Sequence, residues 1–131
     1  MLRHIALEIK ESDLRDFYIE ILGGKITREF TLNESDAKKI FNISGPLNVY
    51  ELAIGNLKFE LFIHDSLEQD SLQHICVQMD NPSEVFSKAI EMKYKTHLRK
   101  NNERETYFIK DNNGNLFEIK KKEECHEQFV S

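Results

Sequence analysis

The sequence is short of cysteine and has no long apolar run, and each shortage excludes a class of protein. Its two cysteines, Cys76 and Cys125, cannot build the disulfide framework of a small secreted domain. No apolar run approaches the roughly 20 residues that a helix needs to cross a bilayer. The N-terminus also lacks the pattern of a signal peptide. These features predict a cytoplasmic protein that does not act at a membrane.

Basic residues are also outnumbered. The chain has 18 Lys and Arg against 23 Asp and Glu, which gives a formal net charge of −5. The only lysine cluster, residues 120–122, is followed directly by Glu123 and Glu124. This balance argues against nucleic acid as a partner and leaves a small molecule as the expected one. A length of 131 residues fits one domain, or two small modules that share a core.

The strongest positive feature is a repeat. The segment His4-Ile5-Ala6-Leu7-Glu8-Ile9 has a counterpart in His74-Ile75-Cys76-Val77-Gln78-Met79. The segment Gly55-Asn56-Leu57-Lys58-Phe59-Glu60-Leu61 has a counterpart in Gly114-Asn115-Leu116-Phe117-Glu118-Ile119. Each half of the chain therefore opens on a histidine and closes on a glutamate.

The order of elements is the same in both halves. Each begins with an alternating strand and continues with a helix whose apolar residues fall at helical spacing. Three further strands are expected in each half, at 25–32, 49–54 and 58–64 and then at 95–100, 106–110 and 116–121. A short extra helix is expected at 33–41. We predict an α+β protein of two βαβββ modules, 1–65 and 72–122, forming a curved eight-stranded mixed sheet with helices outside. Residues 123–131 are a polar tail.

Strand alternation places the repeated polar residues on one face. Side chains at every second position share a face of a strand, so His4, Glu60, His74 and Glu118 all lie opposite the apolar positions. Two imidazoles and two carboxylates suit Zn²⁺, Ni²⁺, Co²⁺, Fe²⁺ or Mn²⁺. A single strand histidine is more often structural, but four matched positions favour one divalent metal ion per site. The alternatives are relics of a metal-binding ancestor and a polar pocket without metal. Cys76 is expected to be a small buried residue rather than a nucleophile.

These motifs resemble a known family. The opening His4-Ile-Ala-Leu, followed by Ser12-Asp13-Leu14, Phe17-Tyr18 and Leu22-Gly23, is similar to the opening of the glyoxalase/bleomycin-resistance proteins, the vicinal oxygen chelate superfamily. The segment 111–119 is similar to that family's closing motif, and the resemblance covers about residues 2–121. In metal-dependent members the opening residue and the closing acid of each half bind the ion. The resemblance thus implies His4, Glu60, His74 and Glu118 as ligands, the set seen in bacterial glyoxalase I.

The resemblance also implies a class of chemistry. The expected activity is that of a glyoxalase-like lyase or isomerase acting on a small oxygenated metabolite. In the family the ion acts as a Lewis acid that stabilises an enediolate, and a ligand carboxylate moves a proton next to a carbonyl. That base would be Glu118 or Glu60, with Glu118 favoured by analogy. The alternative is a non-catalytic, drug-binding resistance protein of the same fold. Extradiol dioxygenase chemistry ranks low, because a fourth ligand at Glu60 would crowd the open site that O₂ needs.

The expected substrate is not glutathione-linked. Bacterial glyoxalase I carries an arginine four residues after the first ligand and an asparagine four after the second, where this chain has Glu8 and His64. An acidic residue in place of the arginine would repel a glutathione carboxylate. Glu8, Phe62, His64 and Gln78 are the expected substrate-lining residues. A homodimer is expected, because curved half-sheets with exposed edges tend to pair.

Overall fold

The computed structural model describes residues 1–66 and 71–122, so the predicted tail at 123–131, with Cys125, lies outside the described residues. The chain divides into two compact units. The first unit comprises Met1–Asp70 together with Asp111–Asn115, and the second comprises Ser71–Lys110 together with Leu116–Ser131. In the part of the chain that is described, no helix is long and apolar enough to cross a membrane.

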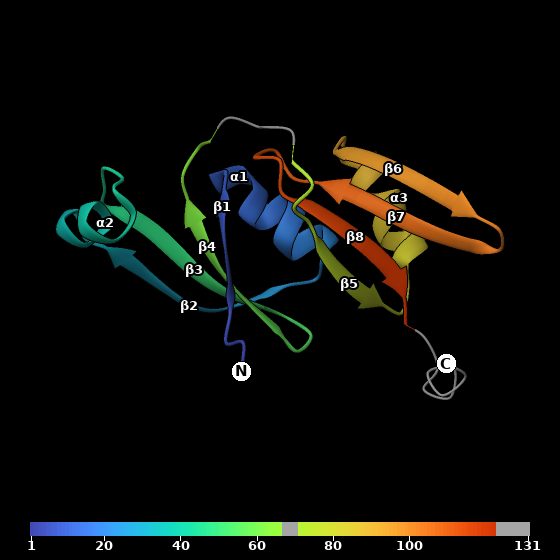
Figure 1. Cartoon of the computed structure of the whole chain (residues 1–131), viewed down its shortest axis with the longest axis horizontal. Coiled ribbons are helices and arrows are strands. Elements are labelled where there is room, and N and C mark those ends of the chain that lie inside the picture. Colours follow the sequence, from blue (N-terminus) through green and yellow to red (C-terminus); the bar gives the residue numbers. More distant parts are fainter. Residues whose placement is uncertain (67–70, 123–131) are drawn as a thin grey trace. The chain divides into compact units, whose positions relative to one another are not determined.

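The first unit has a four-stranded sheet in the order β1-β4-β3-β2 (Figure 1). The strand β1 runs parallel to β4, while β2, β3 and β4 form antiparallel pairs. The bounds of its elements in chain order are β1 (Ile5–Ile9), α1 (Glu11–Asp13), the π-helical η1 (Leu14–Ile21), β2 (Lys25–Leu32), α2 (Glu34–Phe41), β3 (Leu47–Ile54) and β4 (Leu57–Ile63).

The second unit repeats this topology in the order β5-β8-β7-β6, with β5 parallel to β8. Its elements are β5 (Ile75–Met79), α3 (Pro82–Glu91), β6 (Lys95–Asn101), β7 (Arg104–Lys110) and β8 (Leu116–Lys121). Helix α3 packs against β6, β7 and β8. The predicted α+β class and the two βαβββ modules are confirmed. The eight described strands divide into two hydrogen-bonded sheets of four.

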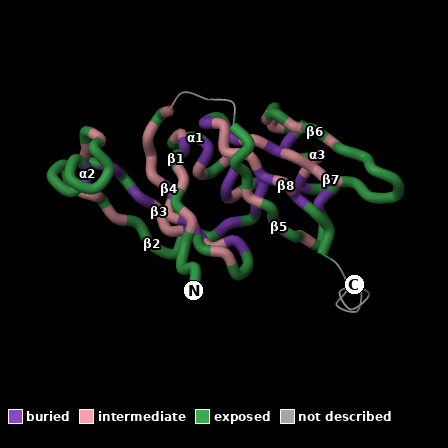
Figure 2. The backbone as a smooth tube through the Cα atoms, in the orientation of Figure 1, coloured by how far each residue is buried: buried purple, intermediate pink, exposed green. Residues whose placement is uncertain are grey.

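Buried residues alternate with more exposed ones along the central strands, as predicted, and Figure 2 marks the buried positions on the backbone. On the parallel strands β1 and β4 of the first unit, Ile9, Phe59 and Leu61 are fully buried. The matching residues of the second unit, Phe117 and Ile119, are fully buried as well. The residues between them stay at least partly exposed, so each sheet presents one apolar face to its core and one mixed face to solvent.

The extra helix of the first unit begins at a side-chain cap. The Oδ1 atom of Asn33 accepts a hydrogen bond from the main-chain N–H of Asp36 at 2.8 Å, which satisfies one of the free donors at the start of α2. The helix ends at Asn42, which adopts the left-handed conformation at φ 58°. The prediction of a short helix at 33–41 is confirmed. Helix α2 has no counterpart among the described residues of the second unit.

Candidate functional site

Each unit contains one of the predicted His–Glu pairs. In the first unit, Nε2 of His4 lies 3.3 Å from Oε1 of Glu60. In the second, Nε2 of His74 lies 3.0 Å from Oε1 of Glu118. The structure thus brings the four predicted ligands together as two pairs, each inside its own unit.

The two pairs occupy equivalent places in the two sheets. Ala6 of β1 pairs with Glu60 of β4, and Cys76 of β5 pairs with Glu118 of β8. Each histidine lies two residues before the strand residue that faces its glutamate, so both side chains of a pair lie on one face of a parallel strand pair. Both glutamates are only about one-fifth exposed, at 20% and 17%. The strand register of the repeat therefore holds each pair in place.

The hydrogen bonds of His74 leave a lone pair facing a carboxylate. Its Nδ1 lies 3.0 Å from the main-chain oxygen of Leu72, which can only accept, so Nδ1 carries a proton. In the neutral ring Nε2 then has a lone pair directed at Oε1 of Glu118. Two such acceptors repel each other unless the ring takes a second proton or a cation binds both atoms. A main-chain carbonyl that accepts from the far nitrogen is also the usual partner of a metal-binding histidine.

The N···O separations suit a shared metal ion. Two ligands at about 2.1 Å from a metal, with an angle of roughly 90–110° between them, lie about 3.0–3.4 Å apart. Both pairs fall within that interval, which also covers a simple hydrogen bond. Among the described residues, no group of three or more His, Cys, Asp or Glu side chains gathers in a way that could hold a metal. Each pair is therefore half of the predicted ligand set.

The surroundings of the two glutamates differ. Oε2 of Glu118 lies 3.3 Å from Nζ of Lys120, and Oε1 lies 3.0 Å from Nε2 of His74, so each carboxylate oxygen has a nitrogen atom beside it. Glu60 instead pairs across β3 and β4 with Glu51, where the second unit has Phe108 opposite Glu118. Like charges opposite each other on one sheet face are unfavourable. The first unit therefore has the stronger need for a cation beside its glutamate.

Cys76 differs from expectation. It was predicted to be a small buried residue, but its side chain is exposed, because it lies on the face of β5 that carries no core. Partial desolvation and the nearby Glu118 carboxylate raise the pKa of its thiol. A raised pKa lowers the fraction of thiolate, the form in which a cysteine acts as a nucleophile.

A pocket in the first unit gathers three of the four predicted substrate-lining residues. It has a volume of about 200 Å³ and is lined by Ala6, Leu7, Glu8, Phe41, Ile43, Leu47, Phe62 and His64. Its one polar pair is formed by Glu8 and His64, with Nδ1 of His64 3.0 Å from Oε2 of Glu8. The fourth residue, Gln78, lies exposed on β5 of the second unit and does not line this pocket. Phe41, which comes from α2, was missed because the repeat gives no counterpart for that helix.

An asparagine-rich turn at 111–115 donates hydrogen bonds to the main chain of Glu8 and His64. Asn115 Nδ2 donates to the main-chain oxygen of Glu8 at 2.8 Å, and Asn113 Nδ2 donates to that of His64 at 2.9 Å. The turn is anchored in the first unit through Asp111, whose carboxylate accepts from the hydroxyl of Tyr18 at 2.7 Å. These two hydrogen bonds join residues 49 and 107 positions apart in the sequence, and they fix the main chain on which Glu8 and His64 stand.

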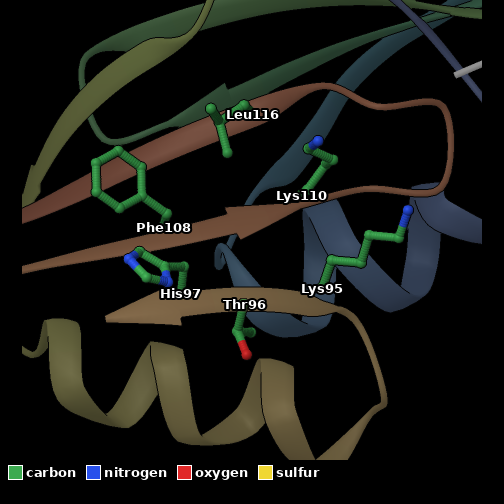
Figure 3. Close-up of a pocket in the computed structure, with 6 residues that line it drawn as sticks. All are labelled: Lys95, Thr96, His97, Phe108, Lys110 and Leu116. Carbon is green, nitrogen blue, oxygen red and sulfur yellow. The ribbon is translucent and has the colours of Figure 1, made fainter. Parts of the chain in front are cut away.

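A larger pocket of about 350 Å³ lies in the second unit (Figure 3). It is lined by Lys95, Thr96, His97, Phe108, Lys110 and Leu116. The rings of His97 and Phe108 lie side by side with centroids 6.3 Å apart, and Lys95 pairs with Lys110 across β6 and β7. Its positive lining suits an anionic group of a ligand. Sequence reasoning missed this pocket, since alternation places these residues on one face but says nothing of a hollow there.

Comparison with known proteins yields likeness of structure only. No family model matches the chain, and no curated protein matches it either. Solved structures do match, among them the fosfomycin resistance protein FosX from Listeria monocytogenes with Mn(II) and 1S,2S-dihydroxypropylphosphonic acid, at TM-score 0.75 and 15% identity over 98% of this chain and 96% of that one.

Two further matches come from other organisms. FosX from Mesorhizobium loti matches at TM-score 0.69 and 12% identity, covering 100% of this chain and 98% of that one. A glyoxalase family protein from Enterococcus faecalis matches at TM-score 0.69 and 21% identity, covering 92% and 96%. The resemblance predicted from the sequence is thus confirmed at the level of fold: this chain has the fold of the glyoxalase/bleomycin-resistance superfamily.

Proposed function

We propose that this protein is a divalent-metal-dependent enzyme, a glyoxalase-like lyase or isomerase that acts on a small oxygenated metabolite. The observation that carries the proposal is the His–Glu pair that recurs at the same register position in both units, with N···O separations of 3.3 and 3.0 Å. The Mn(II) ion named with FosX, a protein of the same fold, supports a divalent ion here.

His4, Glu60, His74 and Glu118 are the proposed ligands of one ion per site, and Zn, Ni, Co, Fe and Mn all suit this donor set. A bound ion of this kind supplies Lewis-acid chemistry toward neighbouring oxygens of a substrate. The donor set fits, because Nδ1 of His74 is engaged by the main-chain oxygen of Leu72, which leaves Nε2 as the ring nitrogen that faces the Glu118 carboxylate.

One of the two glutamates serves as the base that moves a proton next to a carbonyl. Glu118 is favoured by analogy, but Lys120 and His74 engage both of its oxygens. Glu60 contacts only His4 through one oxygen among the described residues, so its carboxylate has more freedom to exchange a proton. Replacing each in turn, Glu60→Gln and Glu118→Gln, distinguishes them: the base variant loses turnover while substrate still binds.

The protein is also proposed to act as a homodimer. Strand β2 forms one edge of the first sheet, and most of its residues are exposed. Such an edge is a ready surface for pairing with a second copy. Light scattering coupled to size-exclusion chromatography measures the mass directly.

The second candidate is a resistance-type protein that binds a drug. Two of the three matching structures described above are named as fosfomycin resistance proteins, and one of these contains a phosphonic acid. The positive lining of the second-unit pocket, with Lys95, His97 and Lys110, suits such an anion. Incubation with fosfomycin separates the candidates, since binding without consumption, together with no metal-dependent turnover of other substrates, favours the second.

Metal content tests the main proposal. We expect purified protein, stripped with a chelator and then incubated with Mn²⁺, Ni²⁺ or Zn²⁺, to retain near-stoichiometric metal after desalting. The variants His4→Ala and His74→Ala should retain little, whereas His97→Ala is the matched control, because His97 lies exposed on β6 outside both pairs. If the stripped wild-type protein recovers no metal, or if all three variants retain it equally, the enzyme proposal fails.

A further inference from the structure

The first-unit pocket differs from the His–Glu pairs in that its polar residues lie among apolar walls. We infer that this pocket binds an uncharged, hydroxyl-bearing apolar part of the substrate, with Nε2 of His64 accepting a hydrogen bond from the hydroxyl and Glu8 excluding anions. This inference names the substrate class for the function proposed above. It stands on the pocket itself and does not require a bound metal.

The contact with Glu8 fixes the proton on His64. A carboxylate can only accept, so the 3.0 Å contact between Nδ1 and Oε2 of Glu8 places the ring proton on Nδ1. Nε2 of the neutral ring is then an acceptor, and within residues 1–66 and 71–122 it has no hydrogen-bond partner. A ligand group that meets it must therefore donate a hydrogen bond.

The remaining walls of the pocket favour an apolar, one-ring ligand. The rings of Phe41 and Phe62 meet edge to face with centroids 5.3 Å apart, and the other apolar lining residues are Ala6, Leu7, Ile43 and Leu47. The volume of about 200 Å³ is below the roughly 300 Å³ at which drug-sized ligand sites begin. Aromatic walls of this kind bind flat apolar groups through burial of their surface.

The charge of the polar pair disfavours anions. With a neutral imidazole the pair carries the single negative charge of Glu8, whose side chain is 47% exposed at the pocket. A ligand carboxylate or phosphonate entering beside it would be repelled, and the apolar walls offer no compensating donor. The preference for an uncharged group therefore comes from the same residue that orients His64.

The position of His64 makes it a specificity residue rather than the catalytic base. It lies four residues beyond Glu60 along the same strand direction, a span of about 13 Å at roughly 3.3 Å per residue. That distance is beyond the reach of a proton transfer at oxygens held near Glu60, since a base must lie within about 3 Å of the proton it takes. His64 therefore acts on which group binds, whereas the proposed metal binding and proton transfer belong to the His–Glu pairs.

Three probes of one size test the inference: phenol, toluene and benzoate. They are titrated by NMR into metal-stripped protein at about pH 8, above the ordinary pKa of imidazole. Phenol should bind about tenfold more tightly than toluene, which lacks the donor, a ratio equal to about 1.4 kcal/mol for one hydrogen bond. Phenol should also bind at least about tenfold more tightly than benzoate.

Variants assign these preferences to the two residues. In His64→Leu phenol and toluene should bind alike, whereas His64→Gln, which keeps an acceptor, should retain the preference for phenol. In Glu8→Gln benzoate binding should improve, while Glu29→Gln, an exposed glutamate on β2, should behave as wild type. The ¹⁵N shifts of the His64 ring should report the Nδ1–H form.

The outcomes distinguish this inference from the proposed function. If the protein binds no metal but keeps the predicted probe preferences, the metal-enzyme proposal fails and the inference about the pocket holds. Metal binding with benzoate preferred over phenol, or with toluene equal to phenol in wild-type protein, would overturn the pocket inference alone. The wild-type comparison needs no variant, so the test holds even where a variant fails to fold.

Discussion

The buried carboxylate of Asp111 gives the sharpest test of how this fold is held together. Asp111 is 2% exposed and accepts four hydrogen bonds. Oδ2 accepts from the hydroxyl of Tyr18 at 2.7 Å and from Nδ2 of Asn115 at 2.9 Å. Oδ1 accepts from the main-chain N–H groups of Asn113 at 3.0 Å and Asn115 at 2.8 Å. A carboxylate is the one side chain of this size that offers acceptors on both sides.

The substitution Asp111→Asn keeps the shape of the side chain and removes one of its two acceptor oxygens. The amide has one oxygen, so its NH₂ group faces two of the four donors. Leaving two donors unmatched costs about 1–3 kcal/mol each. The absence of a buried charge offsets part of this, because burial raises the pKa of Asp111 and so disfavours its ionised form. We expect a net loss of about 3 kcal/mol in the free energy of unfolding, and about 1–2 kcal/mol for Tyr18→Phe, which removes one donor.

The pH dependence of the two variants should run in opposite directions. The folded pKa of Asp111 is raised, so its contribution to wild-type stability falls as pH increases from about 4, where an unfolded aspartate ionises, through the folded value. The cost of Asp111→Asn should therefore shrink with rising pH. The hydroxyl of Tyr18 lowers the pKa of Asp111, so Tyr18→Phe raises it further, and the cost of that variant should grow with rising pH.

Urea unfolding followed by circular dichroism, across a series from about pH 4 to pH 8, measures both slopes. Asp80→Asn, an exposed aspartate of the second unit, is the matched control and should have no effect. A stabilising Asp111→Asn variant would refute the account of four acceptor contacts. Parallel slopes for the two variants would refute the link between the Tyr18 hydroxyl and the ionisation of Asp111.

Two further predictions follow from close packing and from charge. A Cβ atom at Gly24 would lie 2.5 Å from Cδ2 of Leu52 and 2.8 Å from the main-chain oxygen of Tyr18, so Gly24→Ala should cost about 1–3 kcal/mol in urea unfolding. A fully stable Gly24→Ala variant would contradict this packing. Glu51→Gln removes the charge opposite Glu60, so it should stabilise the metal-free protein by up to about 1 kcal/mol, with a higher melting temperature, and weaken Mn²⁺ binding. Calorimetry with and without Mn²⁺ measures both effects, and tighter Mn²⁺ binding in the variant would be the contrary result.

The fold could be predicted from strand periodicity to a considerable extent. The predicted strands 25–32 and 116–121 match β2 and β8 residue for residue. The alternation also placed Phe59 and Leu61 in the core and Glu60 on the opposite face, as the structure has them. Periodicity works here because both sheets have one buried face, which makes every slip of one residue costly.

Sequence periodicity could not predict which distant segments meet. Asp13 accepts from the main-chain N–H and from Nδ2 of Asn112, both at 2.8 Å, across 99 positions. Such contacts belong to a turn, and a turn carries no periodic signal that points to its partner. The walls of the first-unit pocket have the same origin, since Phe41 comes from a helix outside the repeat and meets Phe62 only in three dimensions.

The two units make equivalent main-chain hydrogen bonds at positions where their side chains differ. The main-chain N–H of His64 donates to the oxygen of Ile9 at 3.1 Å, and that of Lys122 donates to the oxygen of Met79 at 3.0 Å, so His64 and Lys122 are equivalent positions. Glu8 and Gln78 are equivalent by the same repeat. A polar pair of Glu8 and His64 in one unit thus corresponds to Gln78 and Lys122 in the other, while the His–Glu pairs are the same in both. Under the proposed function, one ion bound by matched ligands accounts for the two identical His–Glu pairs. A substrate that is not itself symmetric would then contact unlike residues at the neighbouring positions, so mutation of Glu8, His64 or Gln78 should change which substrate is used.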